Sequence, residues 1–180
     1  MFLEQRTEGM GAMNFLKSPF WIAASILFVL LPQMQIEKMW NTDSEKFAAP
    51  TIGYQEIVEL KYDYDWKEHY VIVDVRSDEE IAVSMIPGAI TQAEFERSAL
   101  EHENKKIIAY CTIGVRSGKY ASKLIEEGWD ACNYKGSILD WCENKQSLET
   151  IQGVPTNRVH TYSWWYSVPT MYAAEWKRVG

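Results

Sequence analysis

The chain has few of the residues that build metal centres and disulfide frameworks. Its 180 residues include three histidines and only three cysteines, which are Cys111, Cys132 and Cys142. Three unevenly spaced cysteines are too few for a disulfide framework, and none of them forms a Cys-X-X-Cys pair. No histidine lies at zinc-ligand spacing from a cysteine. We therefore expect neither a metal site nor a bound cofactor.

Positive charge is also in deficit. The chain carries 18 lysines and arginines against 25 aspartates and glutamates, which gives a formal net charge of −7. Because phosphate backbones bind basic surfaces, we expect that nucleic acid is not the partner. The remaining composition, 47% hydrophobic and 24% charged, is that of a globular protein. The length suits one domain with an extension better than two domains.

No apolar run is long enough to span a bilayer as a straight helix. The longest mainly apolar stretch, residues 20–31, follows Lys17 and would form roughly 18 Å of helix, short of the roughly 30 Å hydrocarbon core. It resembles the core of a signal peptide, but residues 32–35 lack small residues at cleavage-site spacing. An uncleaved anchor, a cleaved signal and a buried helix therefore all stay open.

The first two alternatives would place the soluble part outside the cytoplasm. We expect a membrane-anchored or secreted protein, periplasmic if bacterial, that associates with the membrane through a hydrophobic helix at residues 20–31. The predicted organisation is a signal or anchor segment (1–36), a linker (37–50), a domain (51–150) and an aromatic-rich extension that packs on it (151–180).

Within residues 51–150, predicted strands alternate with predicted helices. Apolar runs predict strands buried on both faces, and helical spacing with caps such as Thr51, Ser77 and Gly128 predicts the helices. Such alternation indicates an α/β fold with a mostly parallel sheet covered by helices on both faces. We expect strands at 70–75, 106–110 and 131–134, and helices at 51–60, from 77, at 94–102, at 117–127 and from 137.

One cysteine lies where such sheets bind ligands. Cys111 directly follows the predicted strand 106–110 and precedes the helix that begins near Ser117. Loop amides and the helix dipole would lower the pKa of its thiol and favour the thiolate. Gly114 lets the loop curl close to the sulfur, and Arg116 could add charge or brace the loop.

Several motifs in order make residues 54–143 resemble a single-domain rhodanese. Asp74-Val75-Arg76 is similar to the first-strand motif of that family, and 86–89 (Ile-Pro-Gly-Ala) to its turn. The segment from Tyr110 to Ser117 resembles the active-site loop. Residues 128–129 and 136–141 resemble the closing motifs, with Ser137 where a second glycine is common.

The resemblance implies a sulfurtransferase that carries sulfur as a persulfide on Cys111. A donor such as thiosulfate or a persulfide would load the thiolate, and cyanide, a small thiol or a protein thiol would remove the sulfur. Cys111 and Arg116 would be catalytic, and the loop with its neighbours would bind substrate. The expected binding residues are Thr112, Ile113, Gly114, Val115, Ser117 and Asp74.

Loop length separates this activity from related ones. The six residues from Cys111 to Arg116 are the size that the resemblance associates with sulfur, whereas related phosphatases and arsenate reductases use seven. Thr112 and Ile113 stand where classical rhodaneses have cationic residues that would grip thiosulfate. Two other functions stay open: a non-catalytic binding module with this fold, and a sensor in which Cys111 is oxidised.

Other residues have a structural and a functional interpretation. Asp74 could position the loop or pair with Arg76, and Cys132 and Cys142 are expected to be buried thiols rather than resolving cysteines. We expect the extension to bury its aromatic rings and His160 to be structural. The alternative is an aromatic wall or docking surface beside Cys111, assisted by His160.

Overall fold

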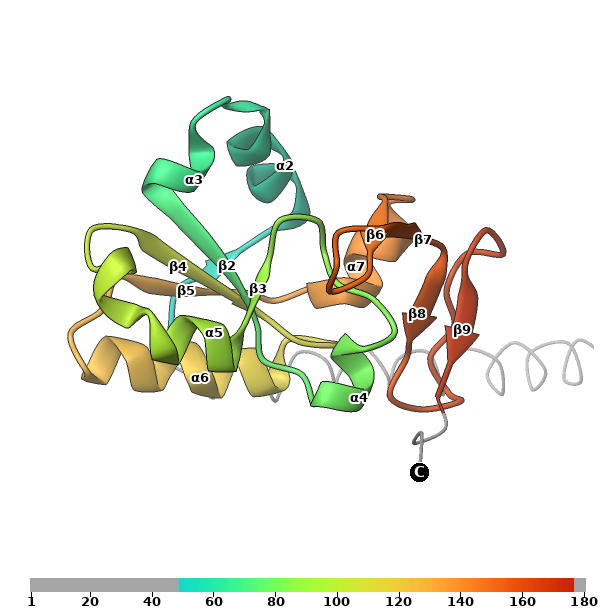
Figure 1. Cartoon of the computed structure of the whole chain (residues 1–180). Coiled ribbons are helices and arrows are strands. Elements are labelled where there is room, and N and C mark those ends of the chain that lie inside the picture. The colour runs from blue at the N-terminus through green and yellow to red at the C-terminus, as the bar shows by residue number, and fades with distance from the viewer. Residues whose placement is uncertain (1–48, 177–180) are drawn as a thin grey trace, which may run out of the picture. The chain divides into compact units, whose positions relative to one another are not determined.

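A five-stranded parallel sheet forms the centre of the computed structural model, which describes residues 49–176. The strand order is β1-β5-β4-β2-β3 (Figure 1). Because neighbouring strands are parallel, their carboxyl ends meet at one edge of the sheet. The bounds are β1 (Thr51–Ile52), β2 (Tyr70–Asp74), β3 (Ile90–Thr91), β4 (Lys106–Tyr110) and β5 (Ala131–Tyr134).

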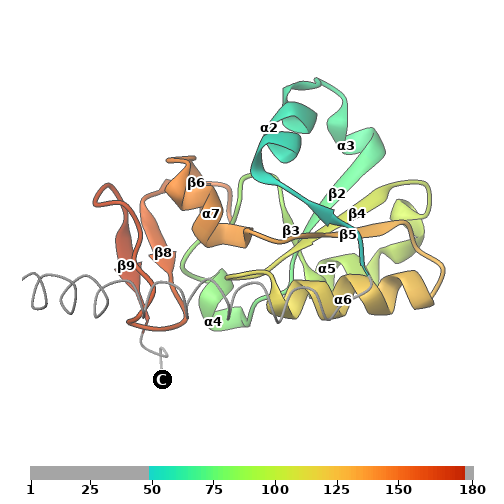
Figure 2. The same ribbon diagram turned by 180° about the vertical axis from the view of Figure 1, so that it is seen from behind.

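Helices cover both faces of this sheet. Helices α5 and α6 lie on one face, and α2 and α7 lie on the other (Figures 1 and 2). The helices are α2 (Tyr54–Tyr62), α3 (Trp66–His69), α4 (Asp78–Ile81), α5 (Gln92–Arg97), the 3₁₀ helix η2 (Ala99–His102), α6 (Val115–Glu126) and α7 (Ser137–Glu143).

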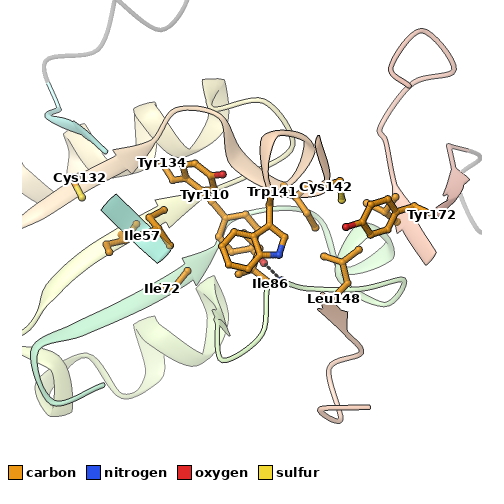
Figure 3. Close-up of a cluster of buried hydrophobic side chains, with 13 residues drawn as sticks. Ile57, Ile72, Ile86, Tyr110, Cys132, Tyr134, Trp141, Cys142, Leu148 and Tyr172 are labelled. Carbon is orange, nitrogen blue, oxygen red and sulfur yellow. Dashed lines mark hydrogen bonds between the residues drawn. The ribbon is translucent and has the colours of Figure 1, made fainter. Parts of the chain in front are cut away.

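Two buried clusters result, one on each face. Phe95 and Leu124 belong to the cluster beneath α5 and α6, where they join the strand residues Val73 and Ala109. The other cluster joins α2 and α7 to the opposite side of the strands and contains Trp141 (Figure 3). The predicted α/β fold, a parallel sheet with helices on both faces, is therefore confirmed.

The element bounds differ from the predictions in a few places. Strands β4 and β5 have the predicted bounds, and β2 ends one residue early. Thr51 was predicted to cap a helix but lies in β1, where it pairs with Asn133; the helix begins after Gly53, whose amide donates to Glu56. The predicted helix at 94–102 is interrupted at Ser98, whose hydroxyl donates back to the Glu94 carbonyl.

The extension continues the fold past residue 150. Strands β6 (Leu148–Glu149) and β7 (Pro155–Thr156) pair across this predicted boundary, and β8 (Arg158–His160) pairs in parallel with β9 (Ala173–Glu175). Tyr172 lies in the same buried cluster as Trp141 (Figure 3). Val159 is fully buried in that cluster, and the Tyr172 hydroxyl donates to the Gln146 carbonyl. The extension thus shares a core with the domain.

The predicted apolar segment at 20–31 lies outside the described residues, as does the predicted linker up to residue 48. Between residues 49 and 176, no helix is long and apolar enough to cross a membrane. The signal or anchor stays a prediction.

Candidate active site at the end of strand β4

Cys111 follows β4 at the carboxyl edge of the sheet and starts a loop that turns directly into α6. The turn depends on Gly114, which has φ +89° and precedes the first residue of the helix. Left-handed backbone of this kind favours glycine, because a Cβ would be strained there. The helix begins at Val115, two residues before the predicted start, so the cysteine lies one tight turn from a helix N-terminus.

Hydrogen-bond donors surround the Cys111 sulfur. The Gly114 amide donates to Sγ at 3.1 Å, and the Ser117 hydroxyl lies 3.5 Å from the same atom. The hydroxyl oxygen of Ser137 lies 3.9 Å away and donates its proton to the Tyr134 carbonyl rather than to the sulfur. The cysteine side chain is almost fully buried. A buried sulfur among donors is suited to carrying negative charge.

The surroundings favour the thiolate. Burial raises the pKa of the Cys111 thiol, but hydrogen bonds from the Ser117 hydroxyl and from the amides of Ser117 and Ile113 lower it, as does the positive charge of Arg116. The net effect is a pKa below the ordinary value of 9.0. This is the direction that a nucleophilic cysteine requires.

Residues at the start of helix α7 form hydrogen bonds with the active-site loop. The Ser137 hydroxyl accepts the Cys111 amide at 3.0 Å and donates to the Tyr134 carbonyl at 2.9 Å. The amides of Ile138 and Leu139 donate to the carbonyls of Cys111 and Thr112. Ser137 has φ +57°, a glycine-like conformation at the position where the resemblance to rhodaneses implies a second glycine. Its hydroxyl supplies a contact that glycine could not make.

A buried asparagine on the neighbouring strand adds a second brace. The Asn133 side-chain amide donates to the Gly114 carbonyl at 3.0 Å, and its oxygen accepts the Ser117 hydroxyl at 2.7 Å. Asn133 therefore ties the turn of the loop to the first turn of α6. We did not predict this residue, which carries no recognisable motif and reaches the loop only because β5 lies beside β4.

The Arg116 guanidinium forms an ion pair with the carboxylate of Glu80. The guanidinium donates to both oxygens of Glu80 at 2.6 and 2.8 Å and to the Thr112 hydroxyl at 2.9 Å. Thr112 also donates to Glu80 at 2.8 Å. Burial raises the pKa of Glu80, but its hydrogen bonds to Arg116, the Ser77 amide and Thr112 outweigh this and lower it to about 2. The sequence indicated Glu80 only as part of the motif after Arg76 and of an acidic first helical turn, not as a residue of the site, where it anchors the loop to α4.

Asp74 was predicted to bind substrate, but it is fully buried and contacts other groups. Its carboxylate pairs with Arg76 at 2.6 Å and accepts the Tyr110 hydroxyl at 2.5 Å. Arg76 reaches on to the Ser84 carbonyl, and Tyr110 accepts the Ile86 amide. The structure therefore corrects this prediction: Asp74 joins β2, β4 and the segment after α4, and acts structurally beneath the loop.

A cavity of about 210 Å³ opens onto the cysteine. Its inner wall is the loop, and its outer wall is two tyrosines of the extension, Tyr162 and Tyr166. The Tyr162 ring lies over the Arg116 guanidinium, 5.4 Å from ring centroid to Cζ. The lining residues are Cys111, Thr112, Ile113, Val115, Arg116, Tyr162 and Tyr166.

The extension buries the Tyr172 ring in the core, as we expected, but leaves most of its other large rings exposed. Tyr162, Trp164 and Trp165 are 63%, 60% and 73% exposed, and the two tryptophans stack with centroids 3.6 Å apart. The alternative arrangement, an aromatic wall beside Cys111, is the one the structure has. His160 is buried and accepts the Tyr162 amide through Nδ1 at 3.1 Å, which supports the turn that carries Tyr162.

Cys132 and Cys142 are buried free thiols. Burial raises the pKa of Cys132 to about 11 and that of Cys142 to about 12. Both belong to the cluster with Trp141, whereas Cys111 belongs to the cluster on the other face (Figure 3). Among the described residues, no group of three or more His, Cys, Asp or Glu side chains is arranged to hold a metal ion.

Known proteins share this arrangement of sequence and fold. The model of the rhodanese-like domain matches residues 55–144. The putative sulfurtransferase YtwF of Bacillus subtilis is 32% identical over 85 residues, which cover 46% of this chain and 82% of that protein. The tRNA uridine(34) hydroxylase of Synechocystis sp. is 27% identical over 157 residues, 82% of this chain but only 52% of that protein.

The hydroxylase of Acinetobacter baylyi is 32% identical over 95 residues, which cover 47% of this chain and 30% of that protein. The chain thus spans about half of the length, or less, of these hydroxylases. Among solved structures, a Rhodopseudomonas palustris protein described as a possible tyrosine phosphatase covers 63% of this chain and 93% of its own, with a TM-score of 0.50 and 21% identity. That likeness concerns the fold alone. The domain model covers half of the chain, and the chain belongs to the rhodanese-like domain family.

Proposed function

We propose that this protein is a sulfurtransferase that carries a sulfane sulfur as a persulfide on Cys111. The observation that carries the proposal is the loop around the Cys111 sulfur, where the Gly114 amide donates at 3.1 Å and the pKa of the thiol is lowered. A lowered pKa supplies the thiolate that must attack the donor. The opening of the cavity onto this sulfur gives the donor a place to bind.

The reaction has two steps. In the first, the Cys111 thiolate attacks the outer sulfur of the donor, and the donor's sulfur–sulfur bond breaks with its electron pair leaving on the donor remnant. In the second, an acceptor nucleophile attacks the outer sulfur of the persulfide and returns Cys111 to the thiolate. Such a sequence gives ping-pong kinetics. The amides that stabilise the thiolate also stabilise the persulfide anion, because the negative charge moves by only one sulfur.

Arg116 acts in this scheme through the loop. Its charge helps to lower the pKa of Cys111, while its nitrogens hold Glu80 and Thr112. Acceptors in the proposal are cyanide, a small thiol or a protein thiol. Residues 20–31 would bring the domain to a membrane if they form the predicted anchor.

A redox sensor is less well supported. A sensor that forms a disulfide needs a second accessible thiol near the first. The other two cysteines are buried with raised pKa values and belong to the cluster on the opposite face of the sheet. A non-catalytic binding module would not require the donors that surround the sulfur.

Intact-mass spectrometry tests the proposal directly. The protein is incubated with thiosulfate, with an organic persulfide and with an aromatic thiosulfonate, and its mass is then measured. We expect a gain of about 32 Da, the mass of one sulfur, which cyanide removes and Cys111→Ser abolishes. Cys132→Ser and Cys142→Ser are the matched controls and should load normally. Absence of the adduct with every donor would overturn the proposal.

The Synechocystis relative brings a second candidate, modification of tRNA at uridine 34. The breadth of that match, 82% of this chain, favours it, whereas the net charge of −7 opposes binding of a polyanion. A gel-shift titration with unmodified tRNA at low salt tests it. Binding that weakens steeply with salt would support an RNA substrate, and no binding at micromolar protein would exclude it.

A further inference from the structure

The cavity at Cys111 has two kinds of wall with different chemistry. The inner wall is the catalytic loop, whose backbone donors serve the sulfur. The outer wall comes from the extension, which lies outside the residues matched by the domain model, 55–144. There Tyr162 and Tyr166 supply ring surface rather than charge. The extension therefore supplies the outer wall of the cavity.

The cavity offers no net positive charge to an anion. Arg116 is the one cation among its lining residues, and the Glu80 carboxylate neutralises it through two hydrogen bonds. Glu80 stays ionised across the physiological range, because its pKa is lowered to about 2. The other lining side chains are neutral apart from the Cys111 thiolate. A dianion would lose hydration here and meet negative charge on the sulfur.

Tyr166 stays neutral, and Tyr162 has a fixed neighbour. Tyr162 lies over the guanidinium that Glu80 and Thr112 hold, so this ring sits against an ordered support. Burial above all, with smaller electrostatic effects from Tyr162 and the Cys111 thiolate, raises the pKa of Tyr166, which keeps its phenol protonated. Flat apolar faces with a hydroxyl at the rim suit a ligand whose body is aromatic or apolar.

We propose that Tyr162 and Tyr166 form a subsite for the carbon body of an organic sulfur donor, and that the enzyme prefers monoanionic organic donors with an aromatic or apolar group over thiosulfate. This inference rests on the proposed function and names the substrate class of the same site. The loop carries the transferred sulfur, and the tyrosines bind the group from which that sulfur departs.

Three donors of matched chemistry separate charge from ring contact. Thiosulfate is a dianion, methanethiosulfonate is a monoanion with a methyl group, and benzenethiosulfonate is a monoanion with a phenyl ring. In each case the Cys111 thiolate bonds to the outer sulfur. The bond to the sulfonyl or sulfonate sulfur breaks, and its electron pair leaves on sulfite, methanesulfinate or benzenesulfinate. The step moves no proton and needs no oxidant.

The measurement is kcat/KM for each donor with cyanide as acceptor. Each value is divided by the rate of the same donor with a small free thiolate, which removes differences in intrinsic reactivity. We expect benzenethiosulfonate to exceed thiosulfate by about tenfold or more, with methanethiosulfonate in between. Tyr162→Leu and Tyr166→Leu should each lower the ratio of benzene- to methanethiosulfonate by about threefold or more.

Tyr64→Leu is the control, because Tyr64 is fully exposed and does not line the cavity. Its donor ratios should equal those of the unmodified protein. Equal corrected values for all three donors, or a preference for thiosulfate, would overturn the subsite, as would unchanged ratios in both cavity variants. Those outcomes leave the persulfide on Cys111 intact, whereas failure to load any donor would overturn the proposed function itself.

Discussion

The backbone of Gly114 lies so close to the carbonyl oxygen of Lys135 that a Cβ built on the glycine would be 2.2 Å from that oxygen. The contact joins the active-site loop to the segment between β5 and α7. Real Cβ atoms do not approach a backbone oxygen so closely, and here neither partner is a flexible side chain. Position 114 therefore requires glycine for two reasons: its backbone has a φ of +89°, and a Cβ would overlap the Lys135 carbonyl oxygen.

Gly114→Ala should distort the loop. We expect a loss of about 3 kcal/mol in the free energy of unfolding, from strain and overlap together, and a fall of at least tenfold in sulfur loading. Gly128→Ala is the matched control, because Gly128 has φ +93° but nothing within 4 Å of its Cβ position. It should cost about 1–2 kcal/mol from strain alone and load normally. Urea unfolding and intact mass measure both effects, and equal costs would contradict the overlap.

We expect the hydrogen bonds of the Ser137 hydroxyl, rather than the space it fills, to stabilise the fold. Ser137→Ala leaves the buried Cys111 amide and the Tyr134 carbonyl without their partner, at an expected cost of about 1–3 kcal/mol. Ser84→Ala is the control, since the Ser84 hydroxyl is fully buried and has no hydrogen-bond partner among the described residues. Its removal should change stability by less than about 0.5 kcal/mol, or increase it. Equal losses in urea unfolding would show that burial, not the hydrogen bond, sets the cost.

The Glu80–Arg116 ion pair should make the free energy of unfolding depend on pH in the acid range. The pKa of Glu80 falls from 4.5 to about 2 on folding, so its contribution is fully present above pH 4.5 and is lost as the pH falls toward 2. Glu80→Gln should therefore be less stable than the unmodified protein at pH 6, by about 1–3 kcal/mol. The gap should narrow between pH 4.5 and 2, where Glu80 becomes protonated and resembles glutamine. A gap that stays constant with pH would contradict the ion pair.

The sequence predicts the sheet and the nucleophile because both depend on local patterns. The short, mainly apolar runs at 106–110 and 131–134 have the length of buried strands, and a cysteine directly after such a strand lies at the carboxyl edge. The residues that contact the loop could not be predicted in this way, because they are far from it in the sequence. Glu80 lies 36 residues before Arg116, and nothing local says that α4 will face the loop.

The same reasoning explains why the sequence could not choose between alternatives for two sets of side chains. Asp74 carries a family motif, so its residue type was informative, but its role depends on Tyr110 and Arg76 filling the space that a substrate would need. The aromatic extension has no periodicity that tells which rings face inward. Tyr162 reaches the cavity because Val159 is buried in the domain's cluster and His160 accepts the Tyr162 amide.

Thiolate titration should isolate Cys111 among the three cysteines. Burial raises the pKa values of Cys132 and Cys142 to about 11 and 12, whereas that of Cys111 lies below 9.0. The ultraviolet absorbance of thiolate should therefore rise in a single step below pH 9.0, and Cys111→Ser should remove that step. Sulfur loading should follow the same curve, because only the thiolate attacks the donor.

Ser117→Ala should move this step to higher pH. The Ser117 hydroxyl helps to lower the pKa of Cys111, and its removal leaves the amides of Ser117 and Ile113 to do so. The hydroxyl has one proton and two acceptors, Sγ of Cys111 at 3.5 Å and Oδ1 of Asn133 at 2.7 Å. A titration that does not move would show that the proton belongs to Asn133 and that the backbone alone stabilises the thiolate. A shift to higher pH, with slower loading at neutral pH, would show that the hydroxyl turns toward the sulfur when the thiolate forms.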